Sequence, residues 1–219
     1  MQATTSAIYE FPLGPLPSGR HSLTREAVLA SQRGRLLDAM AQAVAEHGYP
    51  STTIAHVVSR AGVSRKTFYD HFSDKQECFL AMYDTGIVFV LGRVAETLEG
   101  ENDPHARVLI GLQAFLEVLA GEAAFCRAII IEVHAAGPEA LARRRAVLRV
   151  FADRYLEINE QAREQGKTVG TLSDEAALGV VGAILELVST WVEAGRTAEL
   201  RKLATPLADF VAHNVVPPK

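Results

Sequence analysis

The sequence predicts an all-α protein of about nine helices, with a small N-terminal three-helix domain followed by a larger helical body. From Thr24 onward, apolar residues recur at the spacing of helices, and strand-like alternation is absent. Glycine and proline fall mostly between these periodic segments, where they start or end helices. Apolar residues fill 48% of the 219 positions and charged residues 22%, which indicates a folded globular chain rather than a disordered one.

Local signals bound the first four helices. Their expected ranges are 24–47, 53–61, 64–71 and 73–99. Gly48 ends the first helix, because glycine readily adopts the left-handed backbone that follows a helix. Thr52 or Thr53 can cap the second helix, and Ser73 with Gln76 forms a capping box for the fourth.

Further helical segments fill the rest of the chain. Their expected ranges are 104–120, 123–135, 139–165, 174–194 and 198–215. Asp103 and Pro104 form a cap followed by a first-turn proline, and Ser173 caps the penultimate helix. Pro206 either kinks the last segment or starts its second half.

Residues 1–23 are expected to form a mobile arm, because the first 19 hold three prolines and two glycines with few periodic apolar residues. No secretory signal is visible, and no apolar run approaches the roughly 18 residues of a membrane span. We interpret Cys78 and Cys126 as free thiols that fill the core. These features predict a cytoplasmic protein.

Charge divides the chain into two parts, residues 24–75 and residues 76–219, which we predict to be separate domains. From Arg20 to Lys75 there are eight basic and five acidic residues, whereas the remainder has 14 basic and 21 acidic ones. Phosphate backbones attract a basic module and repel an acidic body. The net charge of −4 therefore does not argue against nucleic-acid binding by the N-terminal part.

Residues 54–72 are typical of a helix-turn-helix. Four apolar residues share one face of its first helix: Ile54, Val57, Val58 and Ala61. Gly62 permits the tight turn, and Phe68 and Phe72 are one helical turn apart and are expected to face inward. The opposite face of the second helix is polar and partly basic: Arg65, Lys66, Thr67, Tyr69 and Asp70. Such a surface suits a recognition helix in the major groove of DNA.

The string Gly-Val-Ser-Arg-Lys-Thr-Phe-Tyr-Asp-His-Phe-Ser-Asp-Lys at 62–75 resembles the signature of the TetR (tetracycline repressor) family. The resemblance extends over about residues 33–83, including Ala-Glu-His-Gly-Tyr at 45–49 and Thr-Thr-Ile at 52–54. Elsewhere the chain matches only in the number and lengths of its helices. The resemblance implies a one-component transcriptional repressor without enzymatic activity, released from its operator by a small apolar or amphipathic ligand.

The resemblance also implies which side chains contact DNA. They are Thr53, Ser64, Arg65, Lys66, Thr67, Tyr69, His71 and Lys75. Residues 64–67 are expected near base edges and flanking phosphates. The remaining four residues are expected to bind phosphates, and the dipole at the start of the fourth helix strengthens the contact of Lys75. Lys66 and Tyr69 have a plain surface role as the alternative. The basic residues of 20–25 either reach a minor groove or make no fixed contact.

The helix at 176–192 is apolar nearly all round, so it is expected to be buried on two sides. Gly179, Gly182 and Ala183 would allow a second subunit to approach closely. In the resembled family the last two helices form a four-helix dimer interface. We therefore expect a homodimer on a pseudo-palindromic DNA operator, since one short helix reads too few base pairs.

A ligand cavity is expected among the fourth to eighth helices. Its candidate lining residues are Phe89, Phe115, Phe125, Glu132, His134, Tyr155, Glu186 and Trp191. Core packing is the alternative for each aromatic residue, and a structural role is the alternative for His134. Glu186 is the most informative candidate, because a carboxylate in an apolar helix must pair, face water or meet a ligand. Arg143, Arg144 and Arg145 form either a solvated face or an anion site.

Other functional classes find little support. The chain lacks the common hydrolase, phosphate-loop, dinucleotide and zinc-protease motifs, and His105 and His134 have no partners at metal-ligand spacing. We therefore predict no catalytic residues, no metal and no cofactor. The alternative function is a small-molecule binding or carrier protein with a vestigial DNA module. Activation of transcription is not separable from repression at this stage.

Overall fold

The structure is a computed structural model that describes residue 8, residues 24–167 and residues 169–216. Throughout these residues the secondary structure is helical, joined by turns and short irregular segments, which confirms the all-α class. The helices are α1 (Arg25–His47), α2 (Ile54–Ala61), α3 (Arg65–His71), α4 (Lys75–Thr97), α5 (Pro104–Gly121), α6 (Ala123–Ile130), α7 (Pro138–Glu164), α8 (Asp174–Glu193) and α9 (Ala204–Val215). Two 3₁₀ helices, η1 (Glu132–Ala135) and η2 (Thr197–Leu203), precede α7 and α9.

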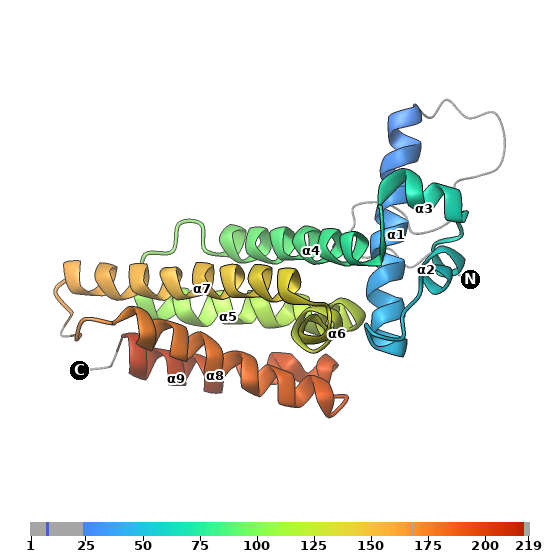
Figure 1. Ribbon diagram of the computed structural model, residues 1–219. Coiled ribbons are helices and arrows are strands. Elements are labelled where there is room, and N and C mark those ends of the chain that lie inside the picture. Colours follow the sequence, from blue (N-terminus) through green and yellow to red (C-terminus); the bar gives the residue numbers. More distant parts are fainter. Residues whose placement is uncertain (1–7, 9–23, 168, 217–219) are drawn as a thin grey trace.

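Helix α1 stands across one end of a bundle formed by α4 to α9 (Figure 1). Helices α2 and α3 pack beside α1, away from the bundle, and α4 leads from α3 into the bundle. Helices α4 and α6 both contact α1, so they join the two parts. Helices α8 and α9 lie on the opposite side of the bundle from α4.

The three N-terminal helices share a small core. Leu36 and Met40 from α1, Val57 from α2 and Phe68 from α3 are each 0% exposed, and Phe72 is 3% exposed. The inward placement of Phe68 and Phe72 agrees with their spacing. Gly62 has φ 62° and ψ 39°, the left-handed conformation that the turn between α2 and α3 requires.

Most helix starts follow the local signals, and the start of α4 differs. Asp103 accepts a hydrogen bond from the Ala106 N–H, and Ser173 accepts one from the Ala176 N–H, as predicted. The cap of α4 is Asp74 rather than Ser73, because the Asp74 carboxylate accepts from the Glu77 N–H at 2.8 Å. Ser73 instead donates to Glu77 from both its N–H and its hydroxyl.

Two predicted segments divide. The segment expected at 123–135 leaves the α-helical form after Ile130 and continues as η1. The segment expected at 198–215 becomes η2 followed by α9. Pro206 lies in the first turn of α9, where its missing N–H leaves no hydrogen bond unmade, so it belongs to the start of a helix rather than to a kink.

Helices α4 and α8 are long and apolar enough, by length and composition, to cross a membrane. The expectation that no segment approaches this limit was therefore wrong, because both helices are apolar on more than one face. The arm expected at 1–23 lies outside the described residues except for Ile8, which is 4% exposed and packs in the core.

Candidate DNA-binding surface and ligand cavity

Helix α3 presents a polar surface to solvent. Its cap, Ser64, accepts a hydrogen bond from the Thr67 N–H at 3.0 Å, and the two hydroxyl groups are 2.9 Å apart. Arg65, Lys66 and Tyr69 are exposed and make no hydrogen bond or ion pair with another described residue. Three large side chains are thus free to contact a partner, whereas Ser64 and Thr67 also hold the helix start.

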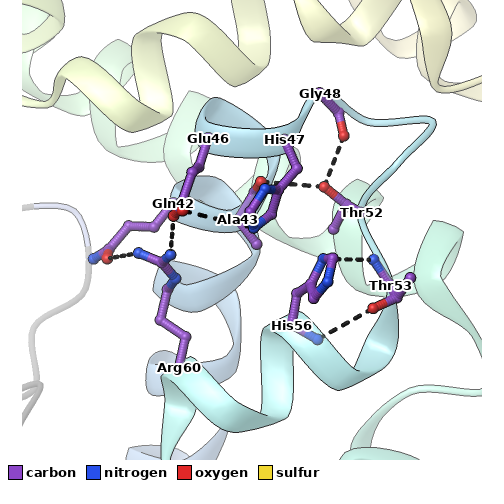
Figure 2. A network of polar contacts seen from close by, with 9 residues as sticks. All are labelled: Gln42, Ala43, Glu46, His47, Gly48, Thr52, Thr53, His56 and Arg60. Carbon is purple, nitrogen blue, oxygen red and sulfur yellow. Dashed lines mark hydrogen bonds and ion pairs between the residues drawn. The ribbon is translucent and has the colours of Figure 1, made fainter.

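Figure 2 shows how polar contacts hold α2 against α1. The Thr53 hydroxyl accepts from the His56 N–H at 3.3 Å, and the His56 Nδ1 accepts from the Thr53 N–H at 3.4 Å. The Thr52 hydroxyl donates to the Gly48 carbonyl at 2.8 Å, and Arg60 pairs with Glu46. Because Thr53 uses its hydroxyl only as an acceptor, its O–H proton remains able to donate to a phosphate.

His71 and Lys75 are half-buried, unlike the exposed groups of α3. The His71 Nε2 lies 3.5 Å from the Gln32 Oε1, and burial, followed by the nearby Arg33, lowers the pKa of His71. The lowered pKa favours the neutral imidazole, which offers an N–H rather than a charge. The Lys75 ammonium donates to the Tyr49 carbonyl at 2.9 Å and lies 4.3 Å from the centre of the Tyr49 ring.

Glu132 joins the helical bundle to the loop between α1 and α2. Its Oε2 accepts a hydrogen bond from the Tyr49 N–H at 2.8 Å, and its Oε1 lies 3.6 Å from the Arg127 guanidinium. The side chain of Glu132 is 12% exposed. A residue expected in the ligand cavity is instead a structural contact between the two parts of the molecule.

A cavity of about 350 Å³ lies inside the bundle, between α4, α5, α7 and α8, with α6 contributing Ile129 and Ile130. One face of α4 lines it at helical spacing: Tyr83, Ile87, Val90, Val94 and Leu98. The facing residues of α7 are mostly apolar as well, including Val147, Phe151 and Ile158. Its charged lining residues are Glu99, Arg107, Arg144 and Arg154. Such a space suits an elongated apolar ligand.

The cavity includes two of the eight lining residues predicted from the sequence, Phe115 and Tyr155. Phe125 packs in the core against Gly86, where a β-carbon in place of the glycine hydrogen would lie 2.0 Å from the phenyl ring. Phe89 packs at the edge of the core, and Trp191 lies under the Arg196 guanidinium at 3.8 Å. His134 and Glu186 are exposed in the single chain and do not line the cavity.

Sequence analysis missed Tyr83 and most of the apolar lining. A sequence signal for this lining was present, because the apolar residues of α4 cover two faces of the helix. Only one apolar face is needed to pack against the core, so the other could have been assigned to the cavity. Burial raises the pKa of Tyr83 to about 12, an effect that the nearby Arg144 opposes. Burial also raises the pKa of Tyr155.

Helices α8 and α9 leave apolar groups uncovered. Leu178 on α8 is 42% exposed and Phe210 on α9 is 40% exposed. Gly179 and Gly182 are also exposed, and a β-carbon at either would meet no atom within 4 Å. A smooth apolar face of this kind on two neighbouring helices is suited to contact with a second subunit.

Cys78 and Cys126 are both free and buried, and burial raises the pKa of Cys126 to about 12. Among the described residues, no group of three or more His, Cys, Asp and Glu side chains is placed to hold a metal ion.

An all-helical chain with an exposed polar recognition helix and an apolar cavity defines a class of DNA-binding regulators. Residues 36–82 match the family model described as bacterial regulatory proteins, tetR family. The HTH-type transcriptional activator FasR of Mycolicibacterium smegmatis is 23% identical over 142 residues, which cover 65% of each chain.

Two solved structures share the fold over most of the chain. The fatty acid degradation regulator FadR from Bacillus halodurans has a TM-score of 0.75 and 20% identity, covering 82% of this chain and 94% of its own. FadR from Bacillus subtilis, solved in complex with stearoyl-CoA, has a TM-score of 0.72 and 17% identity, covering 84% and 98%. Residues 36–82 therefore match the tetR family of bacterial regulatory proteins, and most of the chain shares the fold of these two solved regulators.

Proposed function

We propose that the protein is a homodimeric transcriptional repressor that leaves a pseudo-palindromic operator when an acyl ligand, such as an acyl-CoA, fills its cavity. In this proposal residues 24–75 bind DNA, residues 76–219 bind ligand and dimerise, and residues 1–23 form an arm. The protein acts in the cytoplasm, where the operator and acyl-CoA both occur. The observation that carries the proposal is the apolar cavity of about 350 Å³ behind an exposed recognition helix.

The proposed DNA contacts divide by role. Arg65 and Lys66 read base edges, because they are exposed at the start of α3 and have no partners among the described residues. Ser64, Thr67, Thr53 and Tyr69 bind phosphates or flanking groups through hydroxyls. Two further contacts come from half-buried groups: the His71 N–H and the ammonium of Lys75, which has three donors and gives one to the Tyr49 carbonyl at 2.9 Å and one to the Pro50 carbonyl at 3.5 Å.

Support for an acyl ligand comes from the cavity and from the relatives. Its lining is mostly apolar along α4 and α7. FadR of Bacillus subtilis was solved with stearoyl-CoA, and FadR of Bacillus halodurans is described as a fatty acid degradation regulator. The chain is no more than 20% identical to either, so the ligand class is a proposal for this protein.

A short route connects the cavity to the DNA-binding helices. Ile129 and Ile130 line the cavity, and Glu132 two residues later holds the Tyr49 N–H at the end of α1. A ligand that displaces α6 would therefore strain or break this hydrogen bond. The resulting shift of the α1–α2 corner would change the separation of the two recognition helices in a dimer.

The test begins with selection of DNA from a random pool, which gives the operator and its symmetry. Fluorescence anisotropy with that operator is then measured during titration with dodecanoyl-CoA, with coenzyme A as the control. We expect dodecanoyl-CoA to lower operator affinity at least tenfold and coenzyme A to leave it unchanged. Selected DNA without two-fold symmetry would contradict the dimeric operator, and tight ligand binding without any DNA binding would favour a carrier protein.

The dimer is tested by sedimentation at micromolar concentration. We expect a dimer for the wild-type chain and a shift towards monomer for Gly182→Arg, since an arginine there would separate the two α8 helices. Arg145→Gln, an exposed substitution on α7, is the control and should remain dimeric. A wild-type monomer under these conditions would contradict the proposed assembly.

A further inference from the structure

The cavity has two distinguishable ends, because cross-links fix how α4 and α7 run beside each other. Near their N-terminal parts, the Arg143 guanidinium binds the Asp84 carboxylate at 3.0 Å. At their far ends, Gln161 and Gln165 both donate to the Asn102 carbonyl, just beyond α4. The two helices are therefore parallel (Figure 1), and Tyr83 and Leu98 on α4 mark the two ends, about 22 Å apart along the helix.

The end nearer the DNA-binding helices carries two polar groups without partners. Tyr83 lines the cavity and is 2% exposed, and its hydroxyl makes no hydrogen bond to another described residue. Arg144 also lines this end, is half-buried, and makes no hydrogen bond or ion pair within the described part of the chain. Both groups line the same cavity, so their donors are available to a ligand.

The far end also carries arginines, but carboxylates lie beside them. Arg154 is exposed and pairs with Glu157 at 2.7 Å. Arg107 donates to the Glu101 carbonyl at 3.0 Å from its Nη1, whereas its Nε is buried without a hydrogen-bond partner among the described residues. Glu99 adds a carboxylate to this end. Electrostatics therefore favour an anionic or carbonyl oxygen at the Arg144 end rather than at the far end.

We propose that Tyr83 and Arg144 bind the acyl oxygen of the ligand, so that the chain extends along α4 towards Leu98. The hydroxyl of Tyr83 donates one hydrogen bond to that oxygen, and the guanidinium of Arg144 donates another with its positive charge. Two sources supply this chemistry, the carboxylate of a free fatty acid and the thioester carbonyl of an acyl-CoA. This inference rests on the proposed acyl ligand and adds its orientation and the residues that select its head group.

The experiment measures the affinity of the full-length protein for three probes of equal chain length, dodecanoate, dodecanoyl-CoA and dodecanol, by calorimetry. Arg144→Gln and Tyr83→Phe are the test variants, and circular dichroism with thermal unfolding checks that each folds. Both variants should weaken the probe that carries the natural acyl oxygen at least tenfold. Dodecanol has a neutral hydroxyl in place of the acyl group and should change by less than twofold.

Comparison of the probes identifies the source of the oxygen. A loss confined to dodecanoate indicates a free fatty acid, and a loss confined to dodecanoyl-CoA indicates an acyl-CoA. Arg145→Gln, exposed on α7 and outside the cavity lining, is the matched control and should leave all three affinities unchanged. A tenfold loss in Arg154→Gln but not in Arg144→Gln would overturn the proposed orientation.

Failure of this inference is distinguishable from failure of the proposed function. If the wild-type protein binds the acyl probes and both test variants bind them equally well, Tyr83 and Arg144 do not hold the head group. An equal loss for all three probes also overturns the inference, because it indicates general damage to the cavity. If the wild-type protein binds none of the probes, the acyl ligand class itself is wrong.

Discussion

The exposed surface of α3 and the interior cavity differ in how local their determinants are. The α3 surface arises from seven consecutive residues, Arg65–His71, placed by the Gly62 turn and by the buried ring of Phe68. The cavity is assembled from five helices separated by up to a hundred residues. A short motif therefore specifies the first region, whereas packing between distant helices specifies the second. Substitutions on the α3 surface should therefore have effects on DNA binding and on stability that are separable. Substitutions in the cavity should change both ligand binding and the packing of the helices.

The largest expected effect concerns the core beneath the α3 surface. Phe68→Ala removes a ring that is 0% exposed and should lower the free energy of unfolding of the DNA-binding helices by about 3–5 kcal/mol. Chemical denaturation measures the loss. Tyr69→Ala, which changes a side chain that is 55% exposed, is the matched control and should cost far less. Equal losses would show that α3 is not anchored by Phe68.

Base reading by α3 should be separable from stability. Lys66→Ala is expected to lower affinity for the selected operator by about 1–3 kcal/mol and to change sequence preference, while thermal unfolding stays within error. Repeating the random-pool selection with the variant measures this preference. An unchanged preference would mean that the reading face of α3 is misplaced.

The partly buried carboxyl group of Asp38 on α1 should make the stability of the N-terminal helices depend on pH. Burial, followed by the nearby Glu122, raises the pKa of Asp38 to about 6 in the folded state, above its ordinary value of 3.8. Protonated Asp38 therefore stabilises the folded state fully below about pH 4. This stabilisation is lost as the pH rises through about 6, because Asp38 then ionises in the folded protein. Asp38→Asn, which keeps an oxygen to accept from Gln42, should stabilise the protein at pH 8 by about 1–2 kcal/mol.

Unfolding at pH 4 and at pH 8 checks this expectation. The gain should vanish at pH 4, where Asp38 itself is protonated. The exposed Asp70→Asn is the control and should show no such difference in stability. A gain that is independent of pH would point to a packing effect rather than to ionisation.

The smallest expected effect lies at the boundary between the two regions. Lys75→Ala should lower the slope of log affinity against log salt by about one, because one phosphate contact is lost. Its contact with the Tyr49 carbonyl would be lost as well, so a small drop in stability should accompany the change. Lys202→Ala, on exposed η2, should leave the slope unchanged. An unchanged slope in Lys75→Ala would assign Lys75 to holding Tyr49 alone.

Prediction from sequence succeeded for the inward and outward faces of α3 because its signals are local. Helical spacing placed Phe68 and Phe72 inward, and most polar residues of the opposite face are exposed as expected, whereas Thr67 is half-buried. The same spacing argument failed for the cavity, because the aromatic residues in the bundle have two kinds of environment. Phe125 packs against Gly86 and Phe115 lines the cavity, and nothing in their flanking sequence separates the two cases.

The sequence by itself determined the all-helical class, most helix starts, the turn at Gly62 and the resemblance of the helix-turn-helix to the TetR family, since these depend on short-range periodicity, capping and one contiguous motif. Only the tertiary structure decided that Glu132 holds the Tyr49 N–H, that Glu186 lies outside the cavity, and that Tyr83 and Arg144 face the same cavity. The physical reason is distance along the chain. Hydrogen bonds and lining faces between helices depend on how those helices rotate and pack, and that rotation minimises the free energy of the whole bundle rather than of any one segment.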